Sequence, residues 1–202
     1  MIRAIISDMG RVVIWFDNNI FIKKLAATST VPEDKIKEAA HWNRDLLTDF
    51  DRGAISPRDF YRRVAVAVGS RIGETEFYAI YNDIFRLNPS ALDVLRKQKA
   101  AGATLLLLSN TDALRFGHIR ERYPEILIFD DYVLSFELGM VKPEPGIYIE
   151  AARRAACRLE ECVFIDDMPE NVEAAVKLGM AGIVYRPETD LAAELEKLGL
   201  RS

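Results

Sequence analysis

The feature that most constrains the fold is a set of short, almost wholly apolar runs that each stop abruptly at polar residues. Residues 2–7 form the first run, which Asp8 ends, and residues 104–108 form a second, which Ser109 and Asn110 end. Apolar runs of this length without polar alternation are typical of strands buried on both faces of a parallel sheet. Further runs of this kind cover residues 132–135, 162–165 and 181–185, and the first of these three is the weakest.

The segments between these runs have helical periodicity. Residues 91–101 form an amphipathic stretch that Gly102 closes, and residues 169–178 form another that Gly179 closes. A third helix is predicted from Pro145 to about residue 157, since proline favours the first turn of a helix. Repetition of helix, glycine stop and buried strand predicts an α/β fold with a Rossmann-like parallel sheet.

The pattern changes between residues 17 and 87, where helical periodicity continues without a convincing strand. This block begins just after the first apolar run, and it ends at Asn88-Pro89-Ser90, which is typical of a helix start. The block therefore leaves the α/β part and rejoins it at neighbouring places. We expect a core made of residues 1–16 and 88–202 and a small helical cap made of residues 17–87.

Composition excludes several classes of protein. Half of the 202 residues are hydrophobic and 29% are charged, which suits a globular core. The 31 acidic and 27 basic residues give a net charge of −4 without a run of either sign, so we expect no nucleic-acid or membrane partner. The first apolar run is too short for a signal peptide, and the two cysteines lack metal-binding spacing. These observations favour a cytoplasmic protein.

Polar residues at the ends of several parallel strands meet at one edge of the sheet, where open α/β folds bind ligands. Three carboxylates are expected there, from Asp8, Asp166 and Asp167. The second run adds Ser109 with Asn110, and the segment beyond the weakest run adds Glu137 or Lys142. Crowded carboxylates raise one another's pKa unless a cation lies between them. Oxygen ligands without histidine or thiolate select a hard ion such as Mg²⁺, which is the expected cofactor.

A phosphate bound at this edge would be repelled by the carboxylates, by about 4 kcal/mol at 4 Å and an effective dielectric of 20. The cation and Lys142 would offset that repulsion, and Ser109 and backbone N–H groups would hold phosphoryl oxygens. Attack by Asp8 on phosphorus, which forms an aspartyl-phosphate, is therefore chemically consistent with these residues.

Four ordered motifs that span nearly the whole chain resemble those of the haloacid dehalogenase superfamily of hydrolases. They are Asp8-Met9-Gly10, Ser109-Asn110-Thr111, Lys142-Pro143 and Asp166-Asp167. Within that superfamily the surrounding residues look most like the α-D-glucose-1-phosphate phosphatase group, and less like the phosphatase domain of soluble epoxide hydrolases.

The resemblance implies a role for each motif residue. The resemblance also implies that the helical insert is a cap, which closes over the site, excludes water and selects substrates by their leaving group. The implied roles are Asp8 as nucleophile and Mg²⁺ ligand, the Gly10 carbonyl and Asp167 as further metal ligands, Asp166 as a ligand directly or through water, Ser109 and Asn110 as phosphate ligands, Lys142 as the bridge between nucleophile and phosphate, and Asn171 as the residue that orients the acidic pair.

One position departs from the pattern of phosphatases in this superfamily, which usually have a second aspartate where this chain has Gly10. That aspartate protonates the leaving oxygen and then activates water, which is typically worth 10²–10⁴-fold in rate. The glucose-1-phosphatase group is similar in having glycine there. Asp17 and His41 are alternative proton donors, and Arg52 is a candidate substrate contact.

Three functions remain open from the sequence. The first is a Mg²⁺-dependent phosphomonoesterase acting on a small phosphorylated metabolite such as a hexose 1-phosphate, whose leaving group is comparatively good. The second is a 2-haloacid dehalogenase, in which Asp8 attacks carbon without a metal. The third is a catalytically weak domain that binds phosphate or a partner. The acidic pair Asp166-Asp167 favours the first function.

Overall fold

The computed structural model describes residues 1–42 and 44–200, and this part of the chain is built around one parallel sheet. Its strands lie in the order β5-β4-β1-β6-β7, and every neighbouring pair is parallel. The central strand β1 places Ile6 between Leu106 and Phe164. The predicted Rossmann-like core is confirmed. The strands are β1 (Ala4–Ser7), β4 (Thr104–Ser109), β5 (Asp131–Leu134), β6 (Cys162–Asp166) and β7 (Ala181–Val184).

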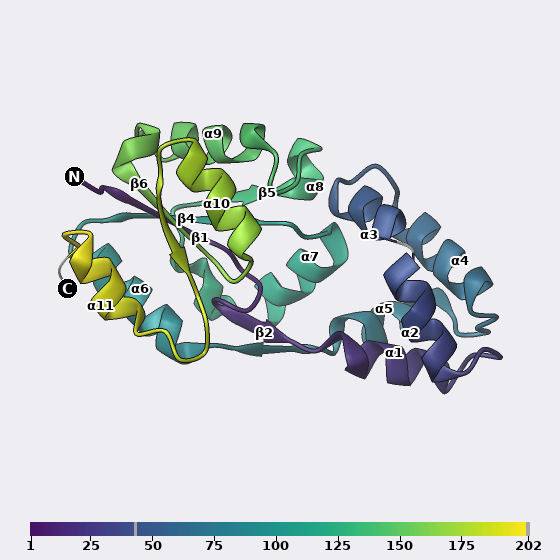
Figure 1. Ribbon diagram of the computed structural model, residues 1–202. Helices are drawn as coiled ribbons and strands as arrows, with labels where there is room; N and C mark the ends of the chain where they lie inside the picture. Colours follow the sequence, from purple (N-terminus) through teal and green to yellow (C-terminus); the bar gives the residue numbers. More distant parts are fainter. Residues whose placement is uncertain (43, 201–202) are drawn as a thin grey trace.

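Helices cover both faces of the sheet because successive strand side chains point to opposite sides (Figure 1). Ile5 faces α6, α7 and α11, where it shares an apolar cluster with Leu95 and Ile119. Its neighbour Ile6 faces α9 and α10, where it packs with Tyr148 and other apolar residues. The helices of this α/β core are α6 (Pro89–Ala100), α7 (Ala113–Arg122), η1 (Pro124–Ile128), α8 (Ser135–Leu138), α9 (Pro145–Arg154), η2 (Leu159–Glu161), α10 (Pro169–Lys177) and α11 (Leu191–Lys197).

The insert after the first strand is helical, as predicted, and Figure 1 shows it as a group of helices beside the sheet. A short antiparallel ribbon connects it to the core, with β2 (Ile14–Phe16) paired to β3 (Phe85–Leu87). The expectation of no strand between residues 17 and 87 was wrong for β3, which is too short for its alternation to be visible in the sequence. The insert's helices are α1 (Asn18–Ala26), α2 (Glu33–Trp42), α3 (Arg44–Asp51), α4 (Pro57–Ala67) and α5 (Glu74–Asn82).

Aromatic residues form the centre of the insert. Phe50 of α3 stacks on Phe60 of α4 with ring centroids 4.2 Å apart, and the Phe60 ring lies 5.3 Å from the Tyr81 ring of α5. These contacts unite helices α3, α4 and α5 around an apolar cluster separate from the two clusters that flank the sheet. We therefore retain residues 17–87 as our proposal for the extent of the cap. Within the described residues, no helix combines the length and apolar character that crossing a membrane requires.

Candidate active site

The carboxyl ends of β1, β4 and β6 bring the motif residues to one edge of the sheet. Asp8 follows β1, Ser109 is the last residue of β4, and Asp166 is the last residue of β6. A cavity of about 370 Å³ opens at this edge, between the α/β core and the β2–β3 ribbon. Its lining includes six of the seven predicted site residues: Asp8, Gly10, Ser109, Asn110, Lys142 and Asp167. The seventh, Asp166, is fully buried beneath them.

The buried ammonium group of Lys142 joins the two carboxylates behind this cavity. Its Nζ donates to Asp8 Oδ1 and to Asp166 Oδ2, each at 2.7 Å, and to the main-chain oxygen of Leu108 at 3.2 Å. These contacts use all three hydrogens of the ammonium group. Lys142 therefore occupies one fixed position beside Asp8 at the wall of the cavity.

Burial and charge act against each other in this group. Burial raises the pKa of Asp8 to about 7, because Lys142 only partly offsets the cost of desolvation and Asp166 adds repulsion. Burial would lower the pKa of Lys142, but the carboxylates of Asp8 and Asp166 outweigh it, so the pKa is raised. The lysine therefore stays charged, and further positive charge nearby would favour the ionised form of Asp8.

Two asparagine side chains fix the positions of the charged groups. Asn110 Oδ1 accepts from the main-chain N–H of Lys142 at 2.7 Å, and Asn110 Nδ2 donates to the Lys142 carbonyl at 3.0 Å. Asn171 Nδ2 lies 3.2 and 3.1 Å from the two carboxylate oxygens of Asp166. The contact of Asn171 with the acidic pair was predicted. The bonding of Asn110 to the lysine segment was not, because the two residues are far apart in the sequence.

Three carboxylates are close enough to share a cation. Oxygen atoms of Asp8, Asp166 and Asp167 lie within 4.8 Å of one another. Burial, reinforced by Asp166, raises the pKa of Asp167, although Arg11 lies 3.8 Å from it. With Lys142 included, the group carries two excess negative charges when ionised, which matches the charge of one Mg²⁺. The donor set thus fits a hard divalent cation.

Gly10 lies in a tight loop between β1 and β2. The Arg11 N–H donates to the Ile14 carbonyl at 2.6 Å, and the Ile14 N–H donates to the Met9 carbonyl at 2.9 Å. A Cβ at Gly10 would lie 3.0 Å from the Phe16 ring and 3.6 Å from Asp8 Oδ2. A side chain here would begin beside the nucleophile, but Phe16 would have to move by a few tenths of an ångström.

Comparison with known proteins assigns the family. A family model described as a haloacid dehalogenase-like hydrolase matches residues 6–179. The chain belongs to this family. Sesquiterpene phosphatase astK of Aspergillus oryzae is 29% identical over 97% of this chain and 96% of its own length. The chain spans only 25% of flavin mononucleotide hydrolase 1 of Arabidopsis thaliana, with 37% identity over 31% of this chain.

A solved structure shares the fold of this hydrolase. A haloacid dehalogenase family enzyme of Bacteroides thetaiotaomicron, in complex with magnesium and inorganic phosphate, superposes with a TM-score of 0.78. The two proteins are 22% identical, and the match covers 96% of this chain and 99% of that chain. The similarity extends over both the α/β core and the helical insert.

A second polar group, at the seam between insert and core, was not predicted. Tyr81 Oη of the insert donates to Asp112 Oδ2 of the core at 2.9 Å, and the Arg115 guanidinium lies over the Tyr81 ring at 4.2 Å. Burial raises the pKa of nearby Asp51 to about 7, and Arg115 only partly offsets it. Asp112 and Arg115 lie one and four residues beyond the predicted motif Ser109-Asn110-Thr111, but no sequence pattern connects them with Tyr81.

Two other candidates from the sequence, Asp17 and Arg52, lie outside the cavity that Asp8 lines. Asp17 is exposed and caps α1 by accepting from the Asn19 N–H at 2.9 Å, and it does not line the cavity of Asp8. Arg52 forms an ion pair with Glu144 and donates to the Gly139 carbonyl at 3.1 Å, so it anchors the insert to the core. The side chain of His41 lies outside the described residues.

Proposed function

We propose that this hydrolase is a Mg²⁺-dependent phosphomonoesterase that works through an aspartyl-phosphate on Asp8. The observation that carries the proposal is the Lys142 ammonium group, 2.7 Å from both Asp8 and Asp166, beside a cluster of three carboxylates. This arrangement places an aspartate with fixed positive charge behind it at the floor of an open cavity. The buried lysine, and a cation that the clustered carboxylates can bind, would offset the repulsion between a negatively charged nucleophile and a phosphate.

Residues for the metal are available without rearranging the hydrogen bonds of the site. The Asp8 and Asp167 carboxylates and the Gly10 carbonyl would hold Mg²⁺, and Asp166 would bind it directly or through water. Because Asp166 accepts from Lys142, Met168 and Asn171, contact through water leaves its present bonds intact. Bound Mg²⁺ would supply the positive charge that keeps Asp8 ionised and offsets the charge of the phosphate.

In the first step, a carboxylate oxygen of Asp8 attacks phosphorus, and the bond from phosphorus to the ester oxygen breaks. The leaving oxygen takes the electron pair of that bond and a proton from a water molecule in the cavity, since Gly10 has no side chain to donate one. Lys142 neutralises the charge that remains on Asp8 and the phosphoryl group, while Ser109 and the second Nδ2 hydrogen of Asn110 hold phosphoryl oxygens. Water then attacks phosphorus of the aspartyl-phosphate, which releases inorganic phosphate and restores the Asp8 carboxylate.

The identity of the substrate is a finer proposal. Sesquiterpene phosphatase astK and the phosphate complex of the Bacteroides enzyme support a phosphate ester. A hexose 1-phosphate, of the kind acted on by the α-D-glucose-1-phosphate phosphatase group, stays a prediction from the motifs. The name of the Aspergillus relative adds an isoprenoid phosphate as a second class to be tested.

The test is phosphate release from glucose 1-phosphate, glyceraldehyde 3-phosphate, farnesyl phosphate and p-nitrophenyl phosphate. We expect turnover of at least one ester with Mg²⁺ and loss of that turnover with EDTA, because the excess carboxylate charge then repels the substrate. If the folded protein releases no phosphate from any of these esters with Mg²⁺, the phosphatase proposal fails. Chloride release from 2-chloropropionate that EDTA does not change would instead identify a dehalogenase.

Substituting Gly10→Asp tests the missing proton donor. The new side chain would begin 3.6 Å from Asp8 Oδ2, where it can reach the leaving oxygen. We expect kcat for a simple alkyl phosphate to rise about tenfold or more, because its alkoxide needs a proton, and kcat for glucose 1-phosphate to change less. Gly10→Ala is the control for the shift of Phe16. Equal effects of Gly10→Asp on both esters would contradict the leaving-group explanation.

A further inference from the structure

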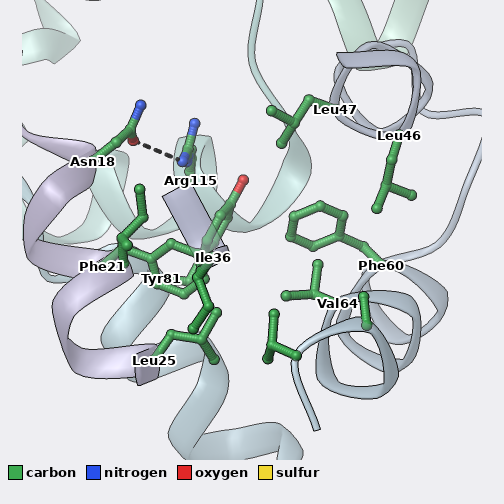
Figure 2. A pocket seen from close by; sticks show the side chains of 13 residues that line it. Asn18, Phe21, Leu25, Ile36, Leu46, Leu47, Phe60, Val64, Tyr81 and Arg115 are labelled. Atoms are coloured by element: carbon green, nitrogen blue, oxygen red, sulfur yellow. Dashed lines mark hydrogen bonds between the residues drawn. The ribbon is translucent and has the colours of Figure 1, made fainter. Parts of the chain in front are cut away.

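A second cavity lies inside the insert, next to the one that Asp8 lines. Its volume is about 140 Å³, and Figure 2 shows apolar side chains from several helices around it. Asn18 and Arg115 line both cavities, and Arg115 Nη2 donates to Asn18 Oδ1 at 3.3 Å. This residue pair therefore stands at the boundary between the proposed phosphate site and the interior of the insert.

Among the described residues, the walls of this second cavity carry few hydrogen-bonding groups, and those of Asn18 and Arg115 lie at its boundary with the first cavity. The hydroxyl of Tyr81 is already bonded to Asp112, and Arg115 Nη2 donates to Asn18 at the boundary, where Arg115 Nε is left as a buried donor without a hydrogen-bond partner in the described part of the chain. A sugar hydroxyl placed here would lose its bonds to water without replacing them, which costs about 1–3 kcal/mol per group. The remaining lining residues are apolar: Phe21, Ile22, Leu25, Ile36, Leu46, Leu47, Phe60, Val64, Ala67 and Val68.

The size of the cavity sets the size of its occupant. Apolar cavities of about 150 Å³ in other proteins stay dry and accept a molecule as large as benzene. A cavity of 140 Å³ therefore suits about six carbon atoms. The wall is partly open, because Leu47 and Ala67 line the cavity and are also exposed, so a longer apolar chain could continue toward solvent.

We propose that the substrate of this enzyme is a phosphomonoester of an apolar alcohol, with an alkyl or isoprenoid chain that occupies the cavity within the insert. This inference rests on the proposed phosphatase function. The phosphate lies at Asp8 and Lys142, the first carbons of the alcohol pass the Asn18–Arg115 pair, and the end of the chain contacts Leu25, Phe60 and Val64. The insert thus selects substrates by apolar burial.

A series of straight-chain alkyl phosphates from ethyl to decyl tests this proposal, because their leaving groups are nearly equal and only the apolar length changes. We expect kcat/KM to rise by about fourfold per methylene while the chain fills the cavity, mainly through KM, and then to level off. Hydrolysis of the whole series at one kcat/KM would overturn the apolar substrate class and leave the phosphatase function standing.

Two variants on helix α4 test whether the dependence of kcat/KM on chain length arises in the cavity within the insert. Val64 lines the cavity, whereas Val66 is 82% exposed on the outer side of the same helix. We expect Val64→Phe to lower kcat/KM for octyl phosphate about tenfold or more and to change ethyl phosphate less than twofold. Val66→Phe should change neither. Equal losses for both esters in a folded Val64→Phe protein would overturn the assignment of the cavity.

Affinity measurements distinguish a failure of the apolar-substrate proposal from a failure of the phosphatase proposal. Octylphosphonate and methylphosphonate cannot be hydrolysed, so their affinities, measured by titration calorimetry with Mg²⁺, do not depend on turnover. We expect octylphosphonate to bind at least about 100-fold more tightly, with a negative heat-capacity change from apolar burial. Equal affinities would overturn the proposal even in an active enzyme. If octylphosphonate bound more tightly as expected but the protein released no phosphate from any ester, the apolar site would be supported and the phosphatase proposal would fail.

Discussion

Substituting Asp8→Asn is expected to lower phosphate release by at least about 10⁴-fold, because the amide cannot form the acyl-phosphate bond. The side chain keeps its size, and Lys142 keeps its contacts with Asp166 and the Leu108 carbonyl. The variant should therefore fold, and the loss should appear in kcat. Single-turnover measurements at saturating substrate and Mg²⁺ would separate a slow chemical step from weak binding.

Asp93→Asn is the matched control for that substitution. Asp93 lies on α6, is 64% exposed and pairs with Arg96 three residues later. This variant should keep full activity, since an exposed pair of this kind contributes at most a few tenths of a kcal/mol. If Asp8→Asn retained more than a tenth of the wild-type kcat, Asp8 would not be the nucleophile and the proposed covalent step would be wrong.

Substituting Lys142→Met is expected to damage both catalysis and folding. Removing the ammonium group leaves Asp8 and Asp166 without the cation that lies 2.7 Å from each. Losing one partner of a buried ionic group typically costs about 3–5 kcal/mol, and we expect that decrease in the free energy of unfolding without Mg²⁺. We expect kcat to fall about 10³-fold with Mg²⁺ present, because charge on the phosphoryl group is no longer neutralised.

Urea unfolding with and without Mg²⁺ measures the folding effect, and Lys197→Met provides the control. Lys197 is 68% exposed and pairs with Glu194 within α11, so its removal should cost less than about 0.5 kcal/mol. Added Mg²⁺ should restore part of the stability lost in Lys142→Met, because it supplies positive charge to the same carboxylates. A Lys142→Met protein as stable and active as the wild type would contradict the role given to this lysine.

The insert is held to the core by polar contacts close to the proposed substrate path. Tyr81 bonds to Asp112, Arg52 pairs with Glu144, and the Ser135 hydroxyl donates to the Asp51 carbonyl at 2.5 Å. Tyr81 and Asp51 both lie near Arg115, which lines the two cavities. The position of the insert, and with it the depth of the apolar cavity, therefore depends on residues that carry no chemistry of their own.

Much of the fold and the site could be predicted from local patterns. The apolar runs predicted the parallel sheet because a strand buried on both faces has no polar alternation. Asp8, Ser109 and Asp166 could be predicted to lie close together because each ends such a strand, and parallel strands share their carboxyl edge. For the same reason Asp167 joins the cluster within 4.8 Å.

The remaining features depend on contacts between distant segments. Phe60 and Val64 have ordinary helical spacing in the sequence, which predicts a buried face but not whether neighbouring helices fill the space beside it. The Asn110 bonds to Lys142 and the position of Arg115 beside Tyr81 likewise join segments that no periodicity connects. The sequence by itself determined the fold class and the residues at the sheet edge, since these follow from strand direction. Only the tertiary structure decided the apolar cavity and its boundary, because an unfilled volume is a property of how separate helices pack.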